Sequence, residues 1–154
     1  MTETTVGLLR HGQTDWNIDF RLQGITDIPL NETGVLQAST AAKHIKPEDW
    51  NFIASSPLSR AKDTAEIIAS SIGIPEIHID SMLLERSFGE AEGLTHAEWK
   101  EKFPDGMPPG GESLDELKLR AISLLDHLAA QYRGTRVLAV SHGAMIRKVV
   151  RLVS

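Results

Sequence analysis

Two short segments of this chain contain the residue types that could do chemistry. Leu-Arg-His-Gly at 9–12 and Ser-His-Gly at 141–143 each follow an apolar run. A neutral imidazole can attack phosphorus near neutral pH, and a guanidinium can hold two oxygens of one phosphoryl group. A histidine beside an arginine, with no metal-ligand spacing around it, therefore favours the handling of phosphate.

These segments fall within an alternation of predicted strands and helices. Short apolar runs predict strands at 6–10, 52–55, 77–79 and 136–140. Apolar residues at helical spacing predict helices over 35–45, 58–72, 95–103 and 114–132, and from 143 to the end. This order is typical of an α/β protein in which helices cover both faces of a central parallel sheet, giving three layers, α/β/α.

Local patterns predict where some of these helices begin. Ser56 is expected to cap the helix that follows the second strand. Ser113 and Glu116 form a capping box at the start of the long helix near the C-terminus. Val35 and Leu114 are expected to be the first residues on the buried faces of their helices.

Parallel strands present their carboxyl ends at one edge of a sheet, where ligands gather. The side chains that the topology predicts at this edge are Arg10, His11, Ser55, Ser56, Arg60, Glu85, Ser141 and His142. The helix that begins near Gly143 directs its positive end at the same crevice.

Phosphoryl transfer through a covalent intermediate fits this set. His11 can attack with one ring nitrogen if a carbonyl holds the other nitrogen protonated. Arg10, Arg60 and a protonated His142 would stabilise the negative charge on the transferring phosphoryl group. Glu85 could supply the proton that the leaving alkoxide needs, and later deprotonate the attacking water. By residue type alone, further candidate acids are Asp15, Glu90, Glu92 and Glu112.

Composition excludes several classes of protein. The chain has no cysteine, which excludes disulfides, thiolate zinc sites and cysteine nucleophiles. Its net charge of −5 argues against general nucleic-acid binding, although local arginines can still form a pocket for an anionic substrate. Neither a membrane span nor a signal peptide is recognisable. We expect a cytoplasmic protein that binds a small phosphorylated substrate, without a metal or other cofactor.

Six segments carry a resemblance to a known family. They are LLRHGQTDWN (8–17), LQGITDIPL (22–30), SSPLSRAKDTA (55–65), ERSFGEAEG (85–93), GGES (110–113) and SHG (141–143). In this order, and over nearly the whole chain, they resemble the histidine phosphatase superfamily, in the branch that includes the cofactor-dependent phosphoglycerate mutases.

The resemblance implies a role for each residue. His11 would be the phosphorylated nucleophile, and Glu85 is singled out from the other carboxylates as the proton donor. The phosphoryl group would be bound by Arg10, Arg60 and His142, with Asn17 contacting phosphate as well. Thr14, Gln23 and Gly24 would line the substrate entrance. The family needs no metal.

Three activities fit these residues. The segment after Glu85 is compact, which is more similar to the phosphatases of the family than to its mutases, because mutases carry longer insertions. A phosphomonoesterase is therefore the first hypothesis. A phosphoglycerate mutase is the second, and a non-catalytic protein that binds phosphorylated ligands is the third.

The end of the chain departs from the family pattern. Family members continue past the second histidine helix with further strands beside the first strand, and this chain has none of them. We therefore expect residues 1–154 to be a single domain that is truncated at its C-terminus; the alternatives are that the protein is naturally short or that a neighbouring molecule covers the edge. The first strand would then be an exposed sheet edge, through which copies of the chain could associate.

Overall fold

The computed structural model describes residues 3–154. The strands are β1 (Thr5–Arg10), β2 (Phe52–Ser55), β3 (His78–Ile79) and β4 (Arg136–Ser141). The α-helices are α1 (Asp15–Ile18), α2 (Glu32–Lys43), α3 (Ser59–Ile72), α4 (His96–Lys102), α5 (Leu114–Gln131) and α6 (Gly143–Val153). Short 3-10 helices lie at Pro47–Asp49, Ser81–Leu83 and Gly89–Ala91. The predicted alternation of strands and helices is confirmed.

The four strands form one parallel sheet in the order β1-β4-β2-β3. All residues of β4 except Arg136 are buried, as expected for the continuous apolar run of a central parallel strand. β1 lies at one edge and is less buried than β4. β1 is therefore an edge strand of the sheet that residues 3–154 form.

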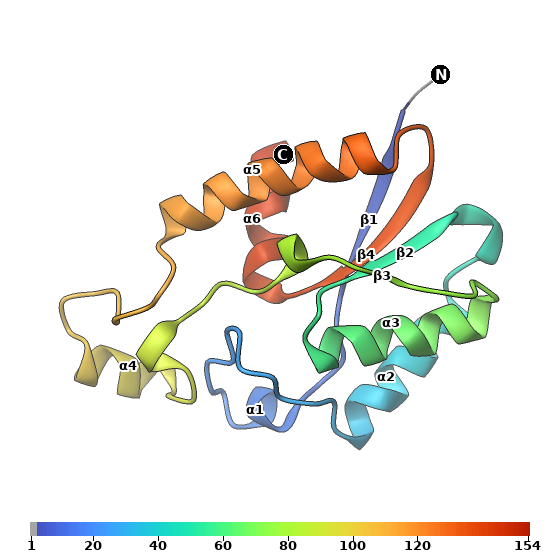
Figure 1. The fold of residues 1–154 in the computed structure, drawn as a ribbon. Coiled ribbons are helices and arrows are strands. Elements are labelled where there is room, and N and C mark those ends of the chain that lie inside the picture. The colour runs from blue at the N-terminus through green and yellow to red at the C-terminus, as the bar shows by residue number, and fades with distance from the viewer. Residues whose placement is uncertain (1–2) are drawn as a thin grey trace.

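Helices cover both faces of this sheet and enclose two cores (Figure 1). On one face, α5 and α6 pack through a cluster that includes Leu124, Leu128 and Met145. On the other face, α2 and α3 pack through a cluster that includes Ile53 and Ile68. The three-layer α/β/α architecture expected from the sequence is confirmed.

Several predicted helix features differ in detail. α3 begins at Ser59 and has no side-chain cap, so the prediction that Ser56 caps it is wrong. Val35 is 43% exposed and Leu114 is 53% exposed, so neither lies in the core. The capping box formed by Ser113 and Glu116 is confirmed.

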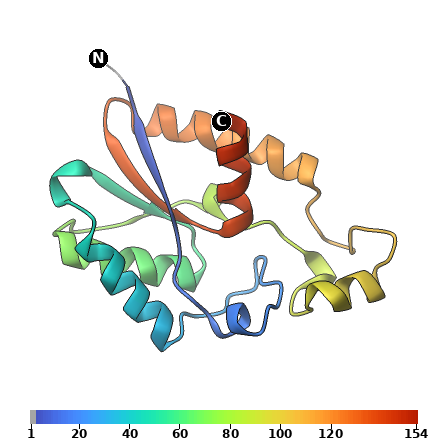
Figure 2. The ribbon, with the colours of Figure 1, turned by 180° about the vertical axis from the view of Figure 1, so that it is seen from behind.

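The carboxyl ends of β1 and β4 point toward one end of the molecule. Figure 2 shows β1 running from the N-terminus toward α1, while α6 starts close to the end of β4 and turns back toward the opposite end. The functional side chains expected from the sequence gather where these strands stop. None of the helices formed by residues 3–154 combines the length and the apolar character needed to cross a membrane.

Candidate active site

The strand register brings the two histidines together. Arg10 is paired with Ser141 across β1 and β4, so the next residues, His11 and His142, leave the sheet side by side. Their ring centroids are 5.0 Å apart, and both residues are buried. Two segments separated by 130 residues of sequence thus form one site, as the topology predicts.

His11 is held in one tautomer. Its Nδ1 lies 2.6 Å from the carbonyl oxygen of Gly12, so Nδ1 donates its hydrogen and Nε2 keeps a free lone pair. The backbone N–H of Gly12 in turn donates to the hydroxyl of Thr64 on α3, at 3.1 Å. Burial, reinforced by the charges of Arg60 and Arg10, lowers the pKa of His11 to about 4. The ring is therefore neutral at neutral pH, which is the state a nucleophile needs.

His142 is neutral too, contrary to the expectation that it is protonated. Burial, followed by the nearby charges of Arg60 and Arg10, lowers the pKa of its ring to about 2. Its Nε2 lies 2.8 Å from the hydroxyl of Ser56, and its Nδ1 is buried with no hydrogen-bond partner among the described residues. With Ser56 donating to Nε2, Nδ1 carries the hydrogen and is free to donate to a ligand.

Arg60 places a buried positive charge beside the histidines. It is 1% exposed, and its Nη1 and Nη2 donate to the carbonyl oxygens of Thr26 at 2.6 Å and Gly24 at 2.7 Å. Its Nε is buried without a partner in the part of the chain that the structure describes. Burial lowers its pKa to about 10, so the guanidinium remains charged at neutral pH. An anion would supply the hydrogen bond that Nε lacks.

The side chain of Glu85 contacts the first turn of α6. Its Oε2 accepts a hydrogen bond from the backbone N–H of Ala144, and its Oε1 accepts one from Met145, both at 3.1 Å. The N–H of Arg86 donates to the same Oε1 at 2.8 Å. The carboxylate thus sits at the positive end of a helix and lines the same cavity as His11.

The other candidate acids do not line this cavity. Glu92 accepts hydrogen bonds from the backbone of Ile25 and Phe88, and Glu112 pairs with Arg120. Asp15 accepts a hydrogen bond from an asparagine side chain in the neighbouring loop. The geometry thus favours Glu85 among the five carboxylates.

The loop after His11 contains α1 and orders the entrance. Asn17 and Thr14 form a capping box at the start of α1, and the Thr14 hydroxyl also donates to Oε1 of Gln23 at 2.7 Å. Asn17, Gln23 and Gly24 line the cavity. Thr14 does not line it; it is fully buried and holds Asn17 and Gln23 in place.

The cavity has a volume of about 350 Å³ and is strongly cationic. The cationic side chains that line it are those of Arg10, Arg21, Arg60, Arg86, Arg147, Lys148 and Arg151, whereas Glu85 is the one carboxylate in the described lining. Arg10 and Arg147 both pack against Gly143, because a Cβ added there would lie 3.5 Å from Cζ of Arg10 and 3.0 Å from Nη1 of Arg147. No carboxylate in residues 3–154 forms an ion pair with either arginine. Two adjacent, unpaired guanidinium groups favour the binding of an anion between them.

A family model described as "Histidine phosphatase superfamily (branch 1)" matches residues 6–154. The chain belongs to the histidine phosphatase superfamily. Across residues 3–154, no three His, Cys, Asp or Glu side chains are grouped so that they could hold a metal ion.

Relatives from this superfamily share most of the chain. An uncharacterized phosphatase, PhoE, from Bacillus subtilis is 42% identical over 98% of this chain and 78% of its own length. A metal-independent phosphoserine phosphatase from Arabidopsis thaliana is 37% identical over 95% of this chain and 67% of its own. The solved structure of a phosphoserine phosphatase mutant from Entamoeba histolytica, in complex with phosphoserine, superimposes with a TM-score of 0.83 at 35% identity, covering 96% of this chain and 78% of that one.

Some features of this site were not expected from the sequence. Ser56 was expected at this edge of the sheet as a helix cap, but the contact of its hydroxyl with His142 was not expected. Arg147 and Arg151 were not expected in the site, and both line the cavity. They are four residues apart in a helix that starts beside His142, so they share one face of α6. This spacing was the signal that could have found them.

The depressed pKa values of the two histidines predict that mild acid destabilises the fold. In the unfolded chain both rings titrate near 6.5, whereas in the folded protein they stay neutral down to about 4 for His11 and about 2 for His142. Unfolding therefore takes up protons below pH 6.5, and the free energy of unfolding falls as the pH falls. Each histidine contributes a slope of about 1.4 kcal/mol per pH unit in this window.

Urea unfolding between pH 7.5 and 4.5 measures this slope. In His11→Ala the free energy of unfolding is expected to change less steeply with pH. The slope should fall by the contribution of about one proton, because one of the two buried rings is gone. Variation of an exposed histidine, as in His44→Ala, is expected to leave the slope as it is in the unaltered protein. Equal slopes for all three proteins would contradict the assignment of neutral, buried histidines.

Proposed function

We propose that the chain hydrolyses small phosphomonoesters through a phosphohistidine formed at His11. The observation that carries the proposal is the combination of a nucleophile and unsatisfied donors. Nε2 of His11 has a free lone pair, and it lies in a site where Nε of Arg60 and Nδ1 of His142 are buried without partners. Buried donors without partners are rare and costly, so a phosphoryl group that satisfies them is expected to bind well.

The first step transfers the phosphoryl group to the enzyme. Nε2 of His11 attacks phosphorus, the bond between phosphorus and the ester oxygen breaks, and the alkoxide takes a proton from Glu85 and leaves as an alcohol. Arg10, Arg60 and His142 stabilise the charge on the phosphoryl oxygens. The dianion also favours the protonated form of His142, which burial disfavours.

The second step regenerates the enzyme. Glu85, now ionised, takes a proton from a water molecule, and the resulting hydroxide attacks the phosphorus of phospho-His11. The bond between nitrogen and phosphorus breaks, inorganic phosphate leaves, and His11 and protonated Glu85 are restored. The position of Glu85 at the cavity wall near the end of β4 supports its use in both steps.

The cavity supports small, anionic esters as substrates. Seven cationic side chains and one carboxylate line it, although the chain as a whole has a net charge of −5. Two relatives are phosphoserine phosphatases by name, and phosphoserine carries a carboxylate besides its phosphate. We extend the proposal to phosphorylated small acids of this kind, handled in the cytoplasm and without nucleic acid as a partner.

Trapping of the phosphoenzyme tests the proposal. The protein is mixed rapidly with a ³²P-labelled phosphomonoester and quenched in alkali, in which phosphohistidine survives. The label is expected on the peptide that contains His11, and inorganic phosphate is expected as the product in the presence of EDTA. Steady turnover without labelled protein, or a label on Ser56, would contradict the phosphohistidine route. A label that passes to a second acceptor, with little release of phosphate, would indicate a mutase.

A further inference from the structure

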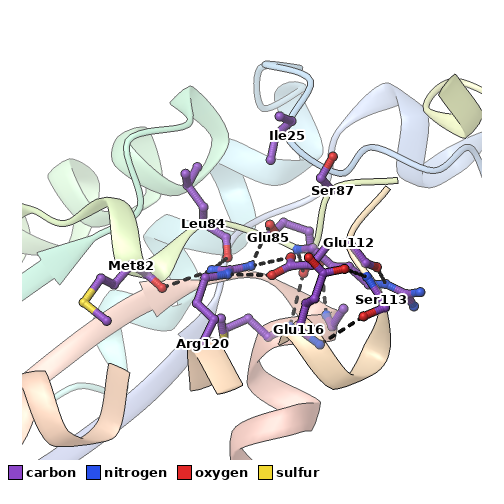
Figure 3. Close-up of polar contacts among 12 residues, drawn as sticks. Ile25, Met82, Leu84, Glu85, Ser87, Glu112, Ser113, Glu116 and Arg120 are labelled. Atoms are coloured by element: carbon purple, nitrogen blue, oxygen red, sulfur yellow. Dashed lines mark hydrogen bonds and ion pairs between the residues drawn. The ribbon is translucent and has the colours of Figure 1, made fainter. Parts of the chain in front are cut away.

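Arg120 holds the backbone that leads to Glu85. It extends from α5, and its Nη1 donates to the carbonyl oxygens of Met82 at 3.3 Å and Leu84 at 2.9 Å (Figure 3). Its Nη2 donates to the carbonyl oxygen of Glu85 at 3.1 Å. One side chain thus contacts three carbonyls within four consecutive residues, and this segment lies outside the regular strands and α-helices. The start of the segment is also held by the 3-10 helix Ser81–Leu83 and by the buried side chain of Leu83, whose carbonyl accepts a hydrogen bond from Ser141. Arg120 extends this support to the carbonyls of Leu84 and Glu85.

Glu112 fixes the guanidinium that makes these contacts. Nε and Nη2 of Arg120 donate to Oε2 and Oε1 of Glu112, both at 2.9 Å, in a paired arrangement that sets the plane of the guanidinium (Figure 3). The two side chains are 24% and 16% exposed. The backbone of Glu112 is bonded to the residues after Glu85 as well, because its N–H donates to Ser87 and its carbonyl accepts from Arg86, both at 2.8 Å.

The side chain of Glu85 depends on this backbone. Its carboxylate is bound by the backbone N–H groups of Arg86, Ala144 and Met145. If the main chain at Glu85 moved by about 1 Å, these hydrogen bonds and the alignment with the leaving group would be lost, which is enough to lower a rate by about 100-fold. Neither Arg120 nor Glu112 lines the cavity, so neither can act on the phosphoryl group directly.

We propose that Arg120 and Glu112 are positioning residues that hold Glu85 where it protonates the leaving group. This inference rests on the proposed function, in which Glu85 is the proton donor. It also gives a role to Glu112, which by residue type alone was itself a candidate acid.

The dependence of the rate on the leaving group tests the inference. p-Nitrophenolate leaves without a proton, whereas the alkoxide of glycerol 3-phosphate needs one. We compare kcat/KM, which reports the phosphoryl transfer step and excludes the later hydrolysis of the phosphoenzyme. Arg120→Met is expected to lower kcat/KM for glycerol 3-phosphate by about 50-fold or more, and that for p-nitrophenyl phosphate by only about 3-fold. Glu85→Gln should show the same selectivity.

A double variant separates positioning from general damage. If Arg120 acts through Glu85, then Arg120→Met combined with Glu85→Gln is expected to be no slower than Glu85→Gln alone on glycerol 3-phosphate. The positioning role would be overturned if the losses of kcat/KM in the two single variants multiplied in the double variant. It would also be overturned if Arg120→Met lost kcat/KM equally on both esters. Lys118→Met, at an exposed position on the same helix, is the matched control and should resemble the unaltered protein.

Milder variants keep the test decisive if Arg120→Met does not fold. Glu112→Gln keeps the size of the side chain but weakens the paired contact, and Arg120→Lys keeps the charge but loses the planar fork. Both are expected to show the same selectivity for glycerol 3-phosphate at a smaller amplitude. If the unaltered protein hydrolyses neither ester, the proposed function itself fails, which differs from equal losses in the variants.

Discussion

His11→Ala is expected to lower kcat for p-nitrophenyl phosphate by at least about 10⁴-fold, or about 5.5 kcal/mol in the activation free energy. Of the two buried histidines, only His11 has a free nitrogen lone pair, on Nε2: its Nδ1 is bound to the Gly12 carbonyl, while Nε2 of His142 is occupied by Ser56. Without His11 the phosphoryl group is still bound but has no covalent acceptor. The loss should therefore appear in kcat and not in KM.

Ligand binding separates lost chemistry from lost structure. Inorganic phosphate is expected to raise the melting temperature of His11→Ala about as much as that of the unaltered protein, because Arg60 and His142 remain. His44→Ala, which removes an exposed histidine at the end of α2, is the matched control and should keep full activity. Retention of more than about a tenth of the activity by His11→Ala would rule out His11 as the nucleophile.

The sequence predicts an element of the fold correctly where a residue pattern has a single physical cause. Continuous apolar runs predicted the strands because central parallel strands are buried on both faces, and β4 is the clearest case. The prediction that Val35 is buried was wrong because the inner face of α2 is made of smaller residues. Gly34, Ala38 and Ala42 are the buried residues of this helix, and a Cβ added at Gly34 would collide with the backbone of Gln13. Hydrophobicity alone does not reveal that a helix packs by close approach.

The sequence predicts which residues form the site better than it predicts their protonation and hydrogen bonds. Because the carboxyl ends of parallel strands meet at one edge of a sheet, the sequence alone predicts that Arg10, His11 and His142 lie together. The protonation of His142 could not be predicted this way, because its pKa depends on burial and on guanidinium groups from other elements. Ser56 was misassigned because α3 begins only at Ser59, with Leu58 at the N-cap position, so the Ser56 hydroxyl lies too early in the chain to cap the helix and contacts His142 instead.

Arg60→Met is expected to lower kcat/KM by about 10²- to 10³-fold, since it removes a buried positive charge placed where phosphoryl charge develops. Burial disfavours this charge, which is why the pKa of Arg60 falls to about 10. A phosphate dianion offsets that cost and satisfies the free Nε. Lys62→Met, at an exposed position on α3, is the matched control and should keep its activity.

Arg60 has a second role that the experiment must separate from the first. Its Nη groups hold the carbonyls of Gly24 and Thr26, so a variant could lose activity through the entrance loop alone. Phosphate at 100 times its Kd should stabilise the unaltered protein by about 2.7 kcal/mol. In Arg60→Met this stabilisation is expected to shrink to a small fraction at the same concentration, because the charge that binds phosphate is gone. If phosphate stabilises the variant as strongly as the unaltered protein, Arg60 acts by ordering the loop and not by binding the phosphoryl group.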